Sequence, residues 1–268
     1  MSVHLGHLRT TAAALVVGLL FPLAGCNEDA GAGDAAMGGP ATATAGPTGE
    51  GDPLAGAPAV DACYWMSMAR AQARTNMSNP VSSCYDDHTT VTYYVGAFPD
   101  DAAAADDAQM IKDCKARLPE AMGLTKKQLA SSVFDFVFFE PSTSQWSAGA
   151  RWFRCDATAE TEGRLKRMPP GSTPILSSGK VEDAYLSCVD DRSGNGDYVT
   201  CNKAHTYRWA GVFTVKGSAT YPKRAFFEKQ GKGCYKYTDN GAYWVTWPLE
   251  PQWDAGDRQM SCYRKTAS

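Results

Sequence analysis

Several signatures of enzymes and metalloproteins are missing from this 268-residue chain. It has no Cys-x-x-Cys pair, no Gly-x-Ser-x-Gly motif, no phosphate-binding loop, no dinucleotide-binding glycines and no calcium-loop spacing. Positive charge is not in excess either, because 26 Lys and Arg residues stand against 29 Asp and Glu residues. These absences argue against a zinc framework and against nucleic acid as a partner, and they predict neither metal nor cofactor.

The chain also lacks a membrane-spanning run near its start. The apolar stretch from Ala12 to Leu20 is shorter than the about 20 residues that a membrane span needs. It follows a polar start containing Arg9 and leads to Leu23-Ala24-Gly25-Cys26, which resembles the lipobox of bacterial lipoproteins. We therefore predict a lipoprotein signal peptide over residues 1–25, cleaved before a Cys26 that carries acyl chains such as palmitate. The alternative is an ordinary signal peptide in which Cys26 is incidental.

Aromatic residues are absent from the segment that follows. Residues 27–59 consist almost entirely of Gly, Ala, Pro, Thr, Asp and Glu, a composition that buries too little apolar surface to offset the loss of chain entropy. The sequence therefore predicts a lipid-anchored, disordered linker over residues 26–59. At ~5–6 Å × √n the tether would reach about 30 Å, so the folded part would stand off the extracytoplasmic face of the cell membrane.

Cysteine is the residue that organises the rest of the chain. Setting Cys26 aside leaves eight cysteines, an even number that in an exported chain predicts four disulfide bonds. They are Cys63, Cys84, Cys114, Cys155, Cys188, Cys201, Cys234 and Cys262. Because eight cysteines allow 105 pairings, their number alone does not choose between them.

An internal repeat narrows the choice of pairing. The segment from Gln145 to Arg151, with Cys155 four residues later, is matched by the segment from Gln252 to Arg258, with Cys262 four residues later. Upstream, Cys84-x-x-x-His88 is matched by Cys201-x-x-x-His205. The chain is therefore a tandem duplication, and each half has four cysteines in the same order.

The simplest symmetric pairing joins the first cysteine to the second and the third to the fourth in each half. In the second half, two β-prone stretches flank a turn at Asn195-Gly196 and predict a hairpin. Such a hairpin would bring Cys188 next to Cys201. The predicted bridges are Cys63–Cys84, Cys114–Cys155, Cys188–Cys201 and Cys234–Cys262.

Segment patterns place strands and helices in both halves. Strands are expected at residues 91–95, 133–139, 208–215 and 243–247, and helices at 101–118 and, shorter, at 222–231. Residues 62–74 are ambiguous, because their composition favours a helix whereas the repeat favours a strand. The fold class is α+β, with a first repeat over 60–158, a linker over 159–182 and a second repeat over 183–268. Each repeat is expected to be a small antiparallel sheet with one helix.

Two motifs could carry chemistry, and a structural reading is favoured for both. A catalytic Cys–His pair needs a free thiolate, whereas every cysteine here has a duplicated partner. His88 and His205 are therefore expected to be hydrogen-bonded residues at the start of a strand. The second motif could hold a sugar or peptide ligand, but it is also suited to a turn in which Trp fills the core and Arg meets a carboxylate or backbone carbonyls. Its residues are Trp146, Arg151, Trp253 and Arg258.

The order of these motifs resembles the septum-formation domain family of actinobacterial envelope proteins. The pattern is Cys-x-x-x-His, then an aromatic residue and Pro, then Cys, then Trp-x-x-Gly-x-Arg and a last Cys. It is carried by Cys84, His88, Phe98-Pro99, Cys114, Trp146, Gly149, Arg151 and Cys155, and by Cys201, His205, Tyr221-Pro222, Cys234, Trp253, Gly256, Arg258 and Cys262. The resemblance implies a link to cell division and no enzymatic activity.

The sequence thus favours a non-catalytic, lipid-anchored binding module of the cell envelope, associated with septum formation. Its partner would be an envelope protein or a cell-wall component, and the duplication predicts similar binding surfaces on both halves. The alternative is an exported enzyme that acts on cell wall or peptides through Glu140, Glu250 or the two histidines.

Overall fold

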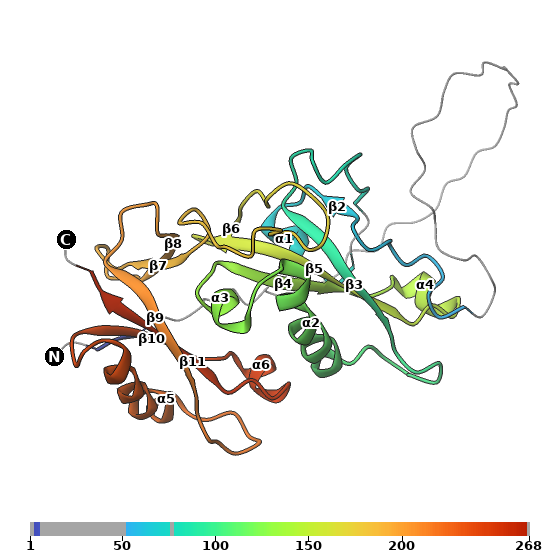
Figure 1. Ribbon diagram of the computed structural model, residues 1–268. Coiled ribbons are helices and arrows are strands. Elements are labelled where there is room, and N and C mark those ends of the chain that lie inside the picture. The colour runs from blue at the N-terminus through green and yellow to red at the C-terminus, as the bar shows by residue number, and fades with distance from the viewer. Residues whose placement is uncertain (1–2, 6–51, 76–77, 267–268) are drawn as a thin grey trace, which may run out of the picture.

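The computed structural model describes residues 3–5, 52–75 and 78–266. These residues form two mainly antiparallel sheets, one in each half of the chain (Figure 1). The predicted α+β class is confirmed. Cys26, its cleavage site and the linker up to residue 51 lie outside the described residues. Within the described part of the chain, no helix is long and apolar enough to cross a membrane.

The first sheet has the strand order β2-β3-β5-β4, with β6 paired to the end of β5. The elements of this half are β2 (Cys63–Tyr64), α1 (Met68–Ala71), β3 (Thr90–Ala97), α2 (Asp107–Met122), α3 (Lys126–Ala130), β4 (Phe134–Phe139), α4 (Thr143–Ser147), β5 (Trp152–Thr161) and β6 (Arg164–Leu165). Apolar side chains of α2, such as Leu118 and Met122, are buried in one cluster with Phe153 and Ala157 of β5. This burial of apolar surface fixes α2 on the sheet.

The main helix of the first half is shifted from its predicted position. The sequence predicts residues 101–118, whereas α2 spans Asp107–Met122. The Asp106 side chain accepts hydrogen bonds from the backbone N–H groups of Ala108 and Gln109, and so caps the helix. Gly123, with φ of 69°, ends it in a left-handed conformation that glycine adopts without strain.

Short helices supplement the single helix predicted for the first half. α1, α3 and α4 have four or five residues each. Each begins after a residue whose hydroxyl accepts a hydrogen bond from the backbone N–H three residues on: Ser67, Thr125 and Ser142. The ambiguous segment 62–74 therefore contains both predicted forms, first a strand and then a helix.

The second sheet has the strand order β1-β10-β11-β9-β7-β8. Its half contains β7 (Ser187–Asp190), β8 (Asp197–Thr200), β9 (Tyr207–Thr214), α5 (Arg224–Gly231), the 3₁₀ helix η1 (Lys232–Tyr237), β10 (Tyr243–Thr246), α6 (Glu250–Asp254) and β11 (Gln259–Lys265). β1 (Val3–Leu5) lies parallel to β10 at the edge of this sheet. β7 and β8 form the predicted hairpin, in which Cys188 pairs with Val199.

All four predicted disulfides are present, with Cα–Cα distances of 5.4, 5.5, 5.1 and 5.4 Å in chain order. Cys114–Cys155 joins α2 to β5, and Cys234–Cys262 joins η1 to β11. The two bridges therefore have the same structural role, because each links the helix of its half to the central strand of the sheet. Loss of chain entropy in the unfolded state makes each worth roughly 3–4 kcal/mol.

The segment between the halves packs onto the first half. β5 continues to Thr161, past the boundary at 158, and pairs there with β6. Met168 and Ile175 are buried in the core of the first half. The Met168 N–H donates to the carbonyl of His88, which ties this segment to the turn before β3. Most of the expected linker 159–182 is therefore a packed part of the fold.

The two halves also contact each other directly. The Phe134 and Tyr185 rings stack with centroids 4.9 Å apart, and the Val133 N–H donates to the Tyr185 carbonyl at 2.8 Å. Lys115 of α2 forms an ion pair with Asp257, which follows α6. Stacking, hydrogen bonds and charge thus hold the halves together across the junction.

Candidate functional site

His88 and His205 occupy equivalent turns, just before β3 and β9. Nδ1 of His88 lies 2.7 Å from the Asp86 carbonyl, and Nδ1 of His205 lies 2.7 Å from the Lys203 carbonyl. Because a carbonyl oxygen can only accept, Nδ1 carries the proton in both rings. His88 is buried and His205 is half-buried. Each ring is thus fastened to the backbone two residues earlier, which is the geometry of a structural residue.

The two Trp–Arg pairs also have matching contacts. The guanidinium carbon of Arg151 lies 4.5 Å from the ring centre of Trp146, and that of Arg258 lies 3.8 Å from the ring centre of Trp253. Arg151 donates to the carbonyls of Trp146 and Ala150, at 2.8 and 2.9 Å. Arg258 donates to the carbonyls of the equivalent positions. The arginines therefore stabilise the turn after α4 or α6 through hydrogen bonds to its backbone carbonyls.

The histidines and the Trp–Arg pairs lie at opposite ends of their sheets. His88 precedes β3, whereas the Arg151 carbonyl accepts from Phe98, just beyond its other end. In the second half the Arg258 carbonyl accepts from Val215, just beyond β9. β3 and β9 have eight residues each, which corresponds to about 25 Å at ~3.3 Å per residue. The structure therefore does not bring the candidate motifs of either half together.

The two carboxylates proposed for an exported enzyme lie in different surroundings. Glu140 accepts two hydrogen bonds from Arg74, at 2.6 and 2.9 Å, in a bidentate ion pair. Glu250 is the exposed first residue of α6. Among the residues that the structure describes, no group of three or more His, Cys, Asp or Glu side chains could hold a metal ion.

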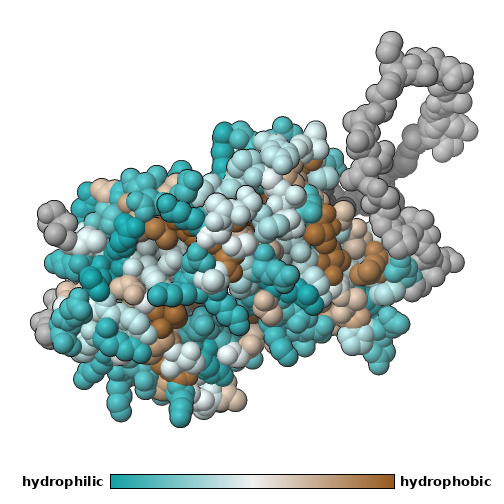
Figure 2. Space-filling model, viewed as in Figure 1, coloured by the Kyte–Doolittle hydropathy of each residue, from teal (hydrophilic) through white to brown (hydrophobic). Residues whose placement is uncertain are grey.

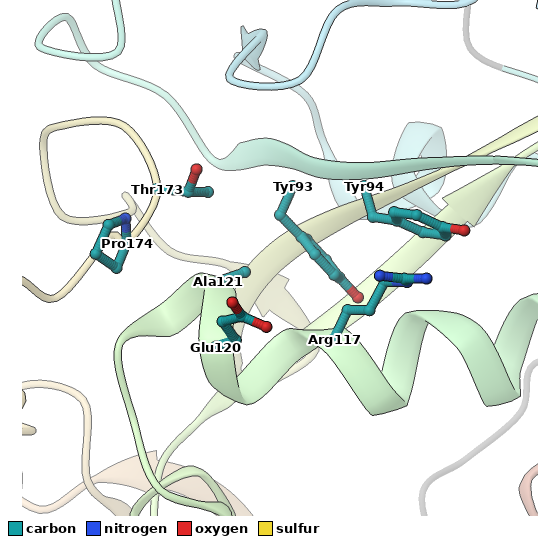
Figure 3. Close-up of a pocket in the computed structure, with 7 residues that line it drawn as sticks. All are labelled: Tyr93, Tyr94, Arg117, Glu120, Ala121, Thr173 and Pro174. Atoms are coloured by element: carbon teal, nitrogen blue, oxygen red, sulfur yellow. The ribbon is translucent and has the colours of Figure 1, made fainter.

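A pocket opens between α2, β3 and the loop that follows β6 (Figure 3). Its volume is about 470 Å³, which lies in the range of small-molecule sites. Seven residues line it: Tyr93, Tyr94, Arg117, Glu120, Ala121, Thr173 and Pro174. None of them belongs to a motif singled out in the sequence, so the motifs do not predict this site.

The walls of the pocket are held by internal contacts. The Tyr93 hydroxyl donates to the Cys114 carbonyl at 2.8 Å and so joins β3 to the disulfide-bonded helix. The guanidinium carbon of Arg117 lies 3.9 Å from the ring centre of Tyr94. On the opposite wall, both the N–H and the hydroxyl of Thr173 donate to Asp61 at 2.9 Å. These contacts form the pocket in advance of any ligand.

The charged groups of the pocket are not paired with each other. Arg117 and Glu120 are exposed side chains one helical turn apart on α2, yet they form no ion pair within 4.0 Å. In Figure 3 the Arg117 guanidinium extends toward the ring of Tyr94, whereas the Glu120 carboxylate points away from it. Within the described part of the chain, neither side chain has a charged or hydrogen-bonding partner. A cation and an anion are thus both available at one opening.

The equivalent place in the second half is lined by different side chains. Tyr94 pairs across the sheet with Cys155, and Gly211 pairs with Cys262, so Tyr94 and Gly211 are equivalent. Arg117 and Tyr237 are equivalent too, because each follows the helix cysteine by three residues. Tyr237 lies directly over Gly211, where an added Cβ would collide with its ring. The first half therefore has Arg over Tyr, and the second half has Tyr over Gly.

The Tyr237 ring is also fixed where it lies. Its hydroxyl donates to the Val212 carbonyl at 2.7 Å, and its ring stacks on Phe213 at 6.4 Å between centroids. Phe213 itself occupies the position of Gly96 in the first half. At this place the side chains of the two halves therefore differ, and the expectation of similar binding surfaces on both halves stays a prediction.

Comparison with known proteins places these features in one family. A family model described as septum formation matches residues 91–262, which are 172 of the 268 residues. The matched range runs from β3 of the first half to β11 of the second and includes both Trp–Arg pairs. It therefore covers the two halves together. No curated protein and no solved structure matches the chain.

Proposed function

Because the chain belongs to the septum-formation family, we propose that it serves cell division as a non-catalytic binding module of the envelope. The proposal includes acylation of Cys26, which would hold the module at the extracytoplasmic face of the cell membrane. The partner would be an envelope protein or a component of the cell wall. The Leu-Ala-Gly-Cys motif and the short apolar run before it support the anchor.

One observation carries the binding role. Apart from the exposed Glu250, the side chains that could perform chemistry are engaged with the protein itself. Arg117, on the ring of Tyr94, and Glu120 instead line an open pocket and have no ion-pair partner among the described residues. His88, Arg151 and Arg258 are committed to backbone carbonyls. A general base or nucleophile would have to reach a substrate proton, whereas these groups are hydrogen-bonded to the backbone.

The visible surface fits recognition of a small polar ligand. Figure 2 shows hydrophobic residues in small separate patches on a face that is otherwise hydrophilic or near neutral. Broad apolar patches are the usual mark of large protein–protein interfaces. The face drawn in Figure 2 therefore has no broad apolar patch of the kind that marks an extended contact surface.

Fluorescence microscopy of dividing cells tests the proposed function. A functional full-length fusion should gather at the septum, and the double variant Arg117→Gln/Glu120→Gln should lose that enrichment while it stays folded and at the membrane. Arg224→Gln is the matched control, because it removes an exposed charge from α5 in the second half. An even distribution of the wild-type fusion throughout division would refute the role at the septum.

Replacement of Cys26 tests the anchor separately. Cys26→Ala should abolish metabolic labelling with a fatty acid and move the protein out of the detergent phase, because the acyl chains supply the membrane affinity. Labelling that persists in this variant would show that the lipid lies elsewhere.

A further inference from the structure

The pocket of the first half offers opposite charges on one side and an apolar wall on the other. Arg117 and Glu120 project from α2, and Pro174 stands on the facing loop. Side chains three residues apart on a helix have Cβ atoms about 5–6 Å apart. The two side chains therefore start close together on α2, and one small ligand could extend from one to the other.

The arrangement of charges excludes several ligand classes. A phosphate or another dianion would be attracted by Arg117 but repelled by Glu120. A simple cation would be attracted by Glu120 but repelled by Arg117. A flat sugar ring would need a free aromatic face, whereas the Arg117 guanidinium already lies 3.9 Å from the ring centre of Tyr94. A ligand with both a cation and an anion satisfies both side chains at once.

We propose that this pocket binds a short peptide through its free amino group and its free carboxylate. Arg117, oriented by Tyr94, would take the carboxylate with two N–H donors. Glu120 would accept from the ammonium group, while Pro174 and Ala121 would face the apolar part. A dipeptide is about 7 Å long at ~3.6 Å per residue, so its two ends can reach side chains that stand one helical turn apart on α2. The proposal deepens the binding role proposed above and rests on it.

Because the second half lacks the charged pair, we expect a single site of this kind per chain. Tyr237 occupies the place of Arg117, and Asn240, which like Glu120 comes six residues after the helix cysteine, lies in the turn beyond the end of η1. Neither residue has a charged side chain, and Tyr237 covers Gly211. The skeleton is thus the same in both halves, whereas the charged pair is present only in the first.

Calorimetric titration of the full-length protein in detergent tests the proposal. The probes are alanyl-alanine, its N-acetyl derivative, its C-terminal amide and free alanine. Each blocked peptide should bind about tenfold or more weakly than alanyl-alanine, as loss of one charge-assisted hydrogen bond requires. Free alanine tests whether the second residue is needed, and equal affinity for it would overturn the peptide assignment.

Two pocket variants assign each end of the peptide to its side chain. In Arg117→Gln the carboxylate should no longer matter, so alanyl-alanine and its amide should bind alike. In Glu120→Gln the amino group should no longer matter, so alanyl-alanine and its N-acetyl derivative should bind alike. Arg224→Gln should behave as wild type. Equal binding of blocked and free peptides by the wild-type protein, or no binding at the solubility limit, would overturn the proposal.

The outcome is separable from that of the proposed function. If the Arg117→Gln/Glu120→Gln fusion leaves the septum but no peptide binds, the pocket has a different ligand and the binding role stands. If peptides bind with the expected pattern while the wild-type fusion is evenly spread, the ligand class stands and the septal role fails.

Discussion

The first half of the chain has an exposed cation beside a tyrosine at the place where the second half has a tyrosine over a glycine. Around this place the halves agree, with the same disulfide from helix to central strand and the same Trp–Arg turn. The comparison shows that the skeletal residues are independent of the pocket. A duplicated scaffold can therefore keep the same disulfide and the same turn in both copies while the side chains beside them differ.

A second difference lies in the central strands. In β5, Arg154 and Asp156 are both buried and form an ion pair at 2.9 Å, and the Arg154 guanidinium lies against the rings of Tyr64 and Phe139. In β11 the equivalent residues are Ser261 and Tyr263, counted from the paired cysteines. The Tyr263 hydroxyl meets Ser187 at 3.1 Å. The first core thus depends on a buried charge pair, and the second depends on neutral contacts.

The largest effect is expected when this charge pair is broken. Asp156→Leu should destabilise the first half by about 3–5 kcal/mol, because Arg154 would remain buried without its partner. Adding Arg154→Met should restore most of the loss, since no buried charge would be left. Urea denaturation monitored by fluorescence measures both. In the second half, Tyr263→Phe should cost only about 1 kcal/mol, the value of one neutral hydrogen bond.

If Asp156→Leu/Arg154→Met were as unstable as Asp156→Leu alone, the unpaired charge of Arg154 would not be the cause of the lost stability.

The second prediction concerns the first bridge of each half. Cys84 is half-buried, whereas both cysteines of the Cys188–Cys201 bridge are buried. Because thiol–disulfide exchange requires access to sulfur, limited reduction should open Cys63–Cys84 first and cost about 3 kcal/mol of stability. Alkylation followed by peptide mass mapping identifies the opened bridge. Earlier labelling of Cys188 or Cys201 would contradict the difference in access.

A smaller effect is expected when the first-half pair is transferred to the second half. Gly211→Tyr should destabilise by about 1–3 kcal/mol, because the new ring overlaps that of Tyr237. The double variant Gly211→Tyr/Tyr237→Arg should recover part of this loss, since it recreates the stacking of Arg117 on Tyr94. Thermal unfolding of the single and double variants measures the coupling. Strictly additive effects would mean that the two positions are not equivalent to the first-half pair.

The smallest effect belongs to the hairpin, which has no full counterpart in the first half. Arg192 donates to both carboxylate oxygens of Asp190 and lowers the pKa of that carboxyl. The contribution is therefore present above the unfolded pKa of about 3.9 and is lost as the pH falls through the lowered folded pKa. Asp190→Asn should slightly reduce stability at pH 7 and leave it unchanged at the acid end. A deficit that persists there would assign the effect to something other than charge.

Local signals in the sequence predicted the parts of the fold that depend on neighbouring residues. The Asn195-Gly196 turn lies between two paired strands, and the repeat led to the disulfide pairs that the structure has. The start of α2 was misplaced because Asp100, Asp101 and Asp106 are all suitable caps. Only the packing of Met110 and Cys114 against the sheet selects the last of them.

The pocket could not be predicted because it depends on which residues stand at positions that are equivalent in the two halves and on how these residues contact one another in the fold. Tyr94 and Gly211, like Arg117 and Tyr237, differ in the sequence, but nothing there shows that one residue of each pair lies over the other. Which residue lies over which follows from the strand register and from the position of the helix on the sheet. Arg154 and Asp156 were overlooked for a related reason, since alternating charges in a strand usually indicate an exposed face.

The central claim is that one of two similar halves holds the binding site. The most direct measurement is the number of alanyl-alanine molecules bound per full-length chain in a calorimetric titration. The account predicts one molecule per chain for the wild-type protein and none for Arg117→Gln/Glu120→Gln. Two molecules per chain, or one that remains in the double variant, would contradict it.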